Sequence, residues 1–121
     1  MDGSLTTHVL DLARGCPAAG VRVELWRLDA SSGGRALLVT TRTNAEGRTA
    51  EPLLAGANFT TGGYELLFDA GEYFAGQGMA TATAPAFLGQ IPVRFYIADP
   101  TVHYHVPLLV TPWGYSTYRG S

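Results

Sequence analysis

Charge, cysteine and long apolar runs are all scarce in this chain of 121 residues. Eight Lys and Arg residues face ten Asp and Glu residues, so no excess of basic side chains exists to neutralise phosphates, and a nucleic-acid partner is not expected. No apolar run approaches the ~20 residues that a helix needs to span a bilayer, so a membrane partner is not expected either. The single cysteine, Cys16, cannot form a disulfide within the chain.

A secretory signal is also missing from the first residues, which carry neither a basic region nor an apolar stretch behind it. Motifs of several enzyme classes are absent too, because the sequence contains no GxSxG nucleophile elbow, no P-loop and no CxxC pair. We interpret Cys16, which lies beside Pro17 in a turn, as structural, since nothing around it in the sequence would activate a thiol. These absences favour a soluble, cytoplasmic protein without disulfide cross-links.

The chain does have enough apolar material for one core. Hydrophobic residues make up 46% of the sequence, and the length is typical of a single domain, which we expect to cover residues 1–121. Apolar and polar residues alternate over 21–25, 64–68 and 91–97, a period of two that is typical of strands with one buried face. Further strands, rich in Val, Thr, Tyr and Leu, are expected over 5–12, 37–43, 80–84, 104–110 and 115–119.

Only one segment carries the signals of a helix. Residues 70–75 follow Asp69, whose short acidic side chain favours the N-cap position, and Glu72 completes a capping box three residues later. Gly76 and Gly78 then favour the end of the helix. With seven or eight short strands and one short helix, the sequence predicts an all-β protein built as an antiparallel β-sandwich.

Histidines mark the first candidate site. His8 lies among apolar strand residues and shares a strand face with Thr6 and Leu10, but a histidine of this kind is more often a surface or satisfied core residue than a functional one. His103 and His105 are a stronger signal, because residues two apart project from the same face of a strand. Imidazole suits proton transfer near neutral pH and also binds metals, so a functional and a structural role both remain open for this pair.

Arg48 follows a tight turn over residues 43–47, in which Asn44 is a turn former and Gly47 can adopt a positive φ. The next strand would then begin in a defined direction, and the guanidinium would present a planar fork of donors to an anionic group. The alternative is a solvated turn arginine, since most arginines are exposed. The last residues, 115–121, alternate aromatic and hydroxyl side chains, so we expect them to be held as a strand rather than to fray.

Four segments are distinctive when taken together: Leu-Thr-Thr-His-Val-Leu-Asp at 5–11, Thr-Asn-Ala-Glu-Gly-Arg at 43–48, His-Tyr-His-Val-Pro-Leu-Leu at 103–109, and Tyr-Ser-Thr-Tyr-Arg-Gly-Ser at 115–121. They resemble the signatures of the 5-hydroxyisourate hydrolase family, the transthyretin-like enzymes of urate breakdown. The two C-terminal segments are the most specific, whereas transthyretins share part of the first. The resemblance extends over nearly the whole chain.

This resemblance implies a transthyretin-like sandwich of about eight strands, assembled as a homotetramer with its sites in the channel between dimers. Carried over residue by residue, it implies catalytic roles for His8, Arg48 and His105, and substrate binding by His8, Arg48, Tyr118, Ser121 and Ser116. Whether His103 also faces the channel stays open. We favour His105, which lies further along the strand, directly before Val106 and Pro107.

The reaction that the resemblance implies needs no cofactor. It is the hydrolysis of the N1–C6 bond of 5-hydroxyisourate, which opens the six-membered ring and gives 2-oxo-4-hydroxy-4-carboxy-5-ureidoimidazoline. Such a step requires an activated water, stabilisation of the developing oxyanion and a proton for the leaving nitrogen. A pair of histidines can supply base and acid and Arg48 can hold the substrate's oxygens, while the division of roles between His8 and His105 stays open.

Two other functions fit parts of the pattern. A non-catalytic carrier, as transthyretin itself is, would need a channel lined mainly by apolar side chains, whereas these motifs supply His, Arg and Tyr. A zinc hydrolase would use three protein ligands and a water, for which His8, His103 and His105 are available. We expect no metal, because histidines on one strand face are common outside metal sites and no carboxylate that would orient them is evident.

Overall fold

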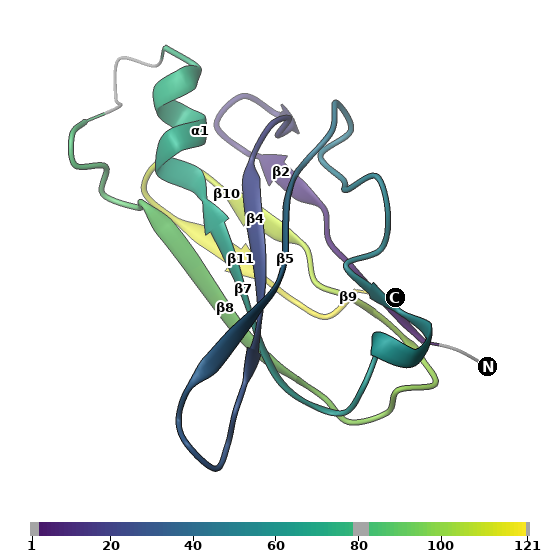
Figure 1. Cartoon of the computed structure of the whole chain (residues 1–121). Helices are drawn as coiled ribbons and strands as arrows, with labels where there is room; N and C mark the ends of the chain where they lie inside the picture. The colour runs from purple at the N-terminus through teal and green to yellow at the C-terminus, as the bar shows by residue number, and fades with distance from the viewer. Residues whose placement is uncertain (1–2, 79–82, 121) are drawn as a thin grey trace.

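The alternating segments form the strands of two facing layers, with a short helix at one end (Figure 1). This computed structural model describes residues 3–78 and 83–120 of the chain. The elements in these residues are β1 (Ser4–Thr6), β2 (Val9–Asp11), β3 (Cys16–Pro17), β4 (Arg22–Leu28), β5 (Arg35–Arg42), β6 (Leu54–Ala55), the 3-10 helix η1 (Gly56–Asn58), β7 (Gly62–Asp69), α1 (Ala70–Gly76), β8 (Gln90–Ile97), β9 (His103–His105), β10 (Leu108–Val110) and β11 (Tyr115–Thr117).

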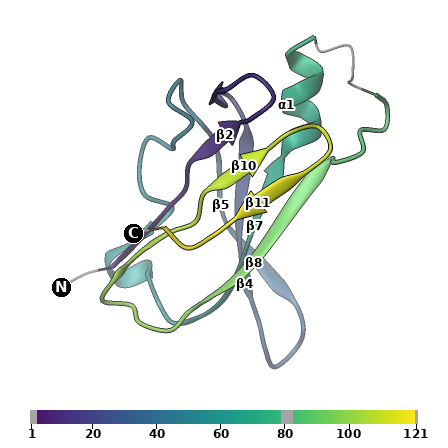
Figure 2. The same ribbon diagram turned by 180° about the vertical axis from the view of Figure 1, so that it is seen from behind.

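One layer is the sheet β5-β4-β7-β8, which holds the long strands and is antiparallel throughout. The other layer consists of the sheets β6-β1-β9 and β11-β10-β2-β3. Because β2 follows β1, and β10 follows β9, after only two residues, these two sheets continue one another along the same chain segments. Figure 2 shows β2, β10 and β11 side by side in this layer.

Two pairings differ from the all-antiparallel arrangement that the sequence predicts. β1 pairs with β9 in parallel, and so does β2 with β10, whereas every other pairing among the described strands is antiparallel. Alternation along a strand reports which face is buried and carries no information on the direction of the neighbouring strand. The parallel pairings place the segment that begins the chain beside the one that begins at residue 103.

Apolar side chains from both layers fill the space between them. Complete burial of a large apolar side chain stabilises the fold by about 1.5–3 kcal/mol, so this interior is the main source of stability. The largest fully buried side chains include Leu5, Leu25, Tyr64, Leu66, Phe68, Ile91, Ile97 and Leu108.

The predicted strands over 21–25, 64–68 and 91–97 are confirmed by β4, β7 and β8, and the one over 37–43 by β5. The segments 5–12 and 104–110 each divide into two strands. Pro107 explains the second interruption, because its nitrogen has no hydrogen to donate to the ladder. The strand expected over 80–84 falls mostly on residues 79–82, which lie outside the described residues.

The predicted helix is confirmed as α1, which begins after Asp69. The Asp69 carboxylate accepts a hydrogen bond of 3.1 Å from the backbone N–H of Glu72, so the expected N-cap is present. Helix α1 includes Gly76 and ends there. Within the described residues, no helix is long and apolar enough to cross a membrane.

A buried polar contact ties α1 to the other layer. The hydroxyl of Tyr73 donates a hydrogen bond of 2.8 Å to the carboxylate of Asp11, which is completely buried at the end of β2. Burial, together with the negative charge of Asp11, raises the pKa of Tyr73 to about 12, so the hydroxyl keeps its proton and remains a donor.

Candidate active site

The register of the parallel pair β1–β9 gathers polar side chains on one surface. Ser4 lies opposite His103 and Thr6 lies opposite His105. The odd-numbered residues from 5 to 11 are buried, whereas the even-numbered residues from 4 to 10 are partly exposed, so the face that the sequence predicts for His8 is confirmed. The outer face of this layer therefore carries all three histidines.

A tight turn brings Arg48 beside His8. Gly47 has the predicted positive φ, at 77°, and a Cβ atom there would clash with the carbonyl oxygen of Val9, so only glycine fits. The side-chain carbonyl of Asn44 accepts a hydrogen bond of 3.2 Å from the backbone N–H of Arg48. An antiparallel bridge then pairs Arg48 with His8, and the Arg48 side chain remains exposed.

The ring of His8 is oriented by the backbone of the same turn. Its Nε2 lies 2.9 Å from the carbonyl oxygen of Glu46. A carbonyl oxygen can only accept, so Nε2 carries a proton and donates it to this bond. In the neutral imidazole, Nδ1 is therefore the nitrogen with a free lone pair, available to a bound molecule.

His105 is half-buried, and its Nδ1 lies 2.8 Å from the hydroxyl oxygen of Thr6. Nε2 has no hydrogen-bond partner among the residues that the structure describes. Burial lowers the pKa of His105 below its ordinary value of 6.5, and so do the positive charge of Arg48 and, whenever they are protonated, His103 and His8. His105 is therefore neutral at pH 7, when its imidazole can accept a proton.

His103 is exposed and belongs to the same hydrogen-bonded group. Its Nδ1 lies 2.7 Å from the hydroxyl oxygen of Ser4, and its Nε2 lies 3.1 Å from that of Thr6. The rings of His103 and His105 lie nearly parallel, with centroids 6.3 Å apart and planes at 15°, so the predicted sharing of one strand face is confirmed. Sequence reasoning did not single out Ser4 or Thr6 as partners, although the alternation with His8 puts both on this face.

The C-terminal segment reaches His105 through Gly120. The backbone N–H of Gly120 donates a hydrogen bond of 2.7 Å to the His105 carbonyl, and a Cβ atom at this glycine would lie only 2.8 Å from Cδ2 of the imidazole. Strand β11 pairs with β10, so the prediction of a strand at this end is confirmed for Tyr115–Thr117, whereas residues 118 and 119 lie outside it. Ser121 lies outside the described residues.

Two of the residues expected to bind substrate, Ser116 and Tyr118, make no hydrogen bond to the histidines within the described residues. Ser116 is exposed and pairs with Leu109 in the β10–β11 ladder. Tyr118 is 59% exposed and lines a separate hollow of about 230 Å³ with Tyr104 and Tyr96. In the described part of this single chain, neither side chain is hydrogen-bonded to a histidine.

The surface beside the histidines is hollowed. An open groove of about 310 Å³ is lined by Thr6, Thr7, Arg48 and His103 together with residues 49–52. We refer to this hollow, with the adjoining His8 and His105, as the histidine groove. Its functional side chains come from β1, β9, the bridge residue His8 and the turn before Arg48, which the backbone bonds described above hold in place.

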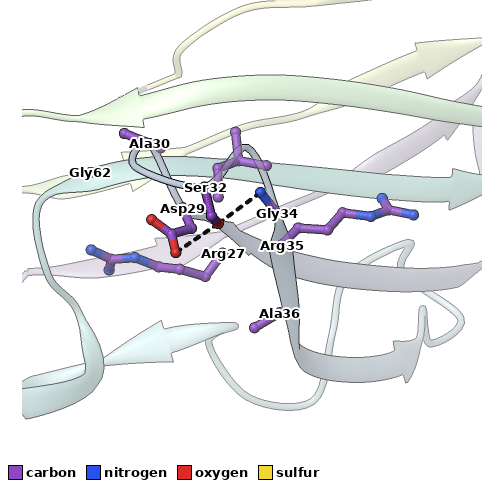
Figure 3. A pocket seen from close by; sticks show the side chains of 10 residues that line it. Arg27, Asp29, Ala30, Ser32, Gly34, Arg35, Ala36 and Gly62 are labelled. Atoms are coloured by element: carbon purple, nitrogen blue, oxygen red, sulfur yellow. Dashed lines mark hydrogen bonds between the residues drawn. The ribbon is translucent and has the colours of Figure 1, made fainter.

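A larger hollow of about 600 Å³ lies at the loop between β4 and β5 (Figure 3). Its polar groups already have partners: the Ser32 hydroxyl donates to Asp29 at 2.9 Å and accepts from the N–H of Gly34 at 3.1 Å. The Arg27 guanidinium donates to the Tyr64 hydroxyl at 2.6 Å. No histidine lines this hollow, so we assign the chemistry to the smaller histidine groove.

The histidine groove offers groups for proton transfer and for binding an anionic oxygen. Among the described residues, no group of three or more His, Cys, Asp or Glu side chains is arranged to hold a metal ion. The imidazoles can accept and donate protons, and the guanidinium of Arg48 can stabilise negative charge on an oxygen. This combination supports hydrolysis by an activated water.

Comparison with known proteins agrees with this chemistry. A model of the HIUase/Transthyretin family matches residues 5–120. A protein of Mesorhizobium japonicum named 5-hydroxyisourate hydrolase is 58% identical over 119 residues, which cover 98% of this chain and 93% of that protein.

Many solved structures share the fold, and three of them illustrate the range of similarity. The crystal structure of (S)-allantoin synthase has a TM-score of 0.92 and 49% identity, and the match covers 99% of this chain but 44% of that one. Klebsiella pneumoniae 5-hydroxyisourate hydrolase has a TM-score of 0.78 and 36% identity, covering 98% and 99% of the two chains. Transthyretin from Sparus aurata has a TM-score of 0.84 and 28% identity, covering 97% and 96%.

Proposed function

The chain belongs to the HIUase/Transthyretin family, and from this premise we propose that the histidine groove is where it carries out its reaction. It is a hydrolase, and it acts on 5-hydroxyisourate, in agreement with relatives of that name. One observation supports the site above all: two neighbouring strands and a tight turn bring His8, Arg48 and His105 together on one face.

His105 is proposed to be the base. Its pKa is lowered by burial and by the neighbouring positive charges, so it is neutral at pH 7, and its Nε2 is free of protein partners among the described residues. It removes a proton from the water that attacks the ring carbonyl, and the same proton can then be returned to the leaving nitrogen. The product is the ring-opened 2-oxo-4-hydroxy-4-carboxy-5-ureidoimidazoline.

Arg48 and His8 are proposed to hold the substrate. The exposed Arg48 guanidinium offers a planar fork of N–H donors, which suits the oxygens of an oxidised purine and the oxyanion that forms when water adds. His8, whose Nε2–H is held by the Glu46 carbonyl, presents Nδ1 as an acceptor for a ring N–H. Both side chains would thus bind the reacting molecule directly.

A homotetramer is proposed to complete the site. Strands β8 and β11 each end a sheet, and large side chains are exposed on them, with Tyr96 at 66% and Tyr115 at 46%. Exposed aromatic groups on open sheet edges favour contact with another subunit. Under this proposal, Tyr118, Ser116 and Ser121 bind substrate in a channel that neighbouring subunits share.

The remaining parts of the proposal concern the setting of the reaction. We propose a single domain over residues 1–121 that works without a cofactor or metal, in the cytoplasm, during urate degradation. A carrier of apolar ligands is disfavoured, since the groove is lined by imidazole and guanidinium groups.

The test is an assay coupled to urate oxidase, which produces 5-hydroxyisourate in the cuvette. We expect the absorbance of this compound to decay faster with the protein than without it, and Arg48→Ala to slow the catalysed decay by about 10²-fold or more. Arg42→Ala is the matched control, because Arg42 is an exposed arginine that pairs with Glu72 outside the groove. An unchanged decay rate with wild-type protein would refute the function, and full activity of Arg48→Ala would refute the site alone.

A further inference from the structure

The hydroxyl of Thr6 lies between two imidazoles. Its oxygen is 2.8 Å from Nδ1 of His105 and 3.1 Å from Nε2 of His103. The other nitrogen of His103 lies 2.7 Å from the hydroxyl oxygen of Ser4. Four polar side chains therefore form one continuous chain of hydrogen bonds, which begins at the half-buried His105 and passes through the exposed His103 to the half-buried Ser4.

Proton counting leaves only two arrangements when both histidines are neutral. A hydroxyl has one proton to donate, and a neutral imidazole has one donor nitrogen and one acceptor nitrogen. If Nδ1 of His105 donates to Thr6, then Thr6 donates to Nε2 of His103, and Nδ1 of His103 donates to Ser4. In the reverse arrangement every donor becomes an acceptor, and Nε2 of His105 then carries a proton instead of a free lone pair.

We propose that Thr6 is a positioning residue that holds His105 in the tautomer with a free Nε2 and passes a proton between His105 and His103. This proposal rests on the proposed function, in which His105 is the base. Thr6 itself does not need to touch the substrate, because it acts through the ring to which it is hydrogen-bonded.

The proton transfers balance at each step. Water loses a proton to the lone pair of His105 Nε2 as its oxygen bonds to the ring carbonyl carbon. The Nδ1 proton of His105 moves to the Thr6 oxygen while the hydroxyl proton of Thr6 moves to Nε2 of His103, which becomes the cation. When the C–N bond breaks, Nε2 of His105 gives its proton to the leaving nitrogen and the two internal transfers reverse, so no proton is gained or lost.

The surroundings of the two rings favour this direction of transfer. His105 is half-buried, and Arg48 adds positive charge beside it, so a cation on this ring is unfavourable. His103 is exposed to water, which solvates a cation even though Arg48 lines the same groove and Arg119 donates a hydrogen bond of 3.2 Å to the His103 carbonyl. Gly120, whose backbone packs against the His105 ring, contributes no charge. The relay would thus place the charge of the intermediate on the better-solvated imidazole.

Three variants test the proposal in the urate-oxidase-coupled assay. Thr6→Val keeps the branched shape but removes the hydroxyl, and we expect kcat to fall by about 10-fold to 100-fold with KM little changed, because the lost group acts on the base rather than on bound substrate. Thr6→Ser restores a hydroxyl, so it should recover most of kcat. Thr60→Val is the matched control, since Thr60 is an exposed threonine whose hydroxyl lies 3.0 Å from that of Tyr64, outside the histidine groove.

A second measurement does not depend on activity. The imidazole ¹⁵N chemical shifts of the free protein report which nitrogen carries the proton, and we expect a protonated Nδ1 at neutral His105 in wild type and in Thr6→Ser, but a mixture of tautomers in Thr6→Val. Wild-type kcat in Thr6→Val, a loss of kcat that Thr60→Val matches, or unchanged ¹⁵N shifts would overturn the proposal. If wild-type protein did not hydrolyse 5-hydroxyisourate, the proposed function would fail, whereas the ¹⁵N shifts would still decide whether Thr6 sets the tautomer.

Discussion

His105 shows how single side chains acquire chemistry from their surroundings. Three chain segments meet at this residue: Thr6 holds Nδ1, Gly120 bonds to its carbonyl, and Arg48 places positive charge nearby. Each contact favours the neutral ring or fixes its orientation. An imidazole in this setting remains a proton acceptor at a lower pH than an exposed one.

The first prediction concerns pH. Because the pKa of folded His105 is lowered, the base stays neutral as the pH is reduced below 7. We therefore expect kcat/KM to fall only at lower pH, with a midpoint under ~6.5, the unperturbed histidine value. The free energy of unfolding changes with pH in the same direction. The contribution of His105 to it is present above the pKa of the unfolded chain and is lost as the pH falls through the lower pKa of the folded protein. A pH–rate profile measures the midpoint, and a midpoint above ~6.5 would contradict the assignment of His105 as the base.

The second prediction concerns the shape of the Arg48 side chain. Arg48→Lys keeps the charge but replaces the planar fork with a single ammonium group, so we expect it to leave kcat/KM within about 10-fold of the Arg48→Ala value rather than to restore activity. Arg42→Lys, outside the groove, is the control for the same chemical change. Wild-type kcat/KM for Arg48→Lys would show that only diffuse positive charge is needed.

At the scale of single elements, the turn that precedes Arg48 determines where this side chain lies. Gly47 satisfies both a positive φ and a close approach to the Val9 carbonyl. The same turn supplies the Glu46 carbonyl that orients His8. A change in its backbone would therefore disturb two proposed substrate contacts together.

The third prediction uses this turn. Gly47→Ala introduces strain at a positive φ and a clash with backbone atoms, so we expect a loss of at least about 1–2 kcal/mol of stability and a clear loss of activity. Gly56→Ala is the matched control, because Gly56 also has a positive φ, of 60°, but a Cβ atom there would meet nothing within 4 Å. Chemical denaturation and the coupled assay measure both effects, and equal losses in the two variants would mean that the close approach at Gly47 is unimportant.

At the scale of the whole molecule, the exposed C-terminal segment is difficult to explain in an isolated chain. Tyr118 and Ser116 are exposed, yet the resemblance assigns them to substrate binding. A symmetric oligomer would cover them, since equivalent strands meet across a two-fold axis. Assembly and catalysis would then depend on the same residues.

The fourth prediction is that deletion of residues 118–121 abolishes catalysis but leaves the β-rich fold largely intact. The described residues of this segment bury little of the core, although Gly120 is bonded to His105 and its loss would free that strand. Sedimentation or light scattering gives the mass, which we expect to be that of a tetramer for the full chain. A fully active monomer, or a truncated protein with wild-type turnover, would contradict the proposed shared site.

The sequence by itself determined most of the elements and indicated His8, Arg48 and His105 as candidate site residues. Alternation of period two predicted β4, β7 and β8, and the Asp69–Glu72 capping box predicted α1. The turn sequence before Arg48 predicted that Gly47 can adopt a positive φ, which it does in the structure. These predictions succeeded because each depends on residues that are neighbours in the chain, where steric limits and hydrogen bonding act whatever the rest of the fold does.

Only the tertiary structure decided how those residues meet. Thr6 and His105 are 99 positions apart, and their contact depends on the parallel register of β1 and β9, which alternation does not report. The tautomer of His8 depends on one carbonyl of a turn that is distant in the sequence. The lowered pKa of His105 depends on its burial and on the charge of Arg48, which lies far from it in the chain. Register and burial arise from the packing of the whole chain, so no local pattern of residues could have shown them.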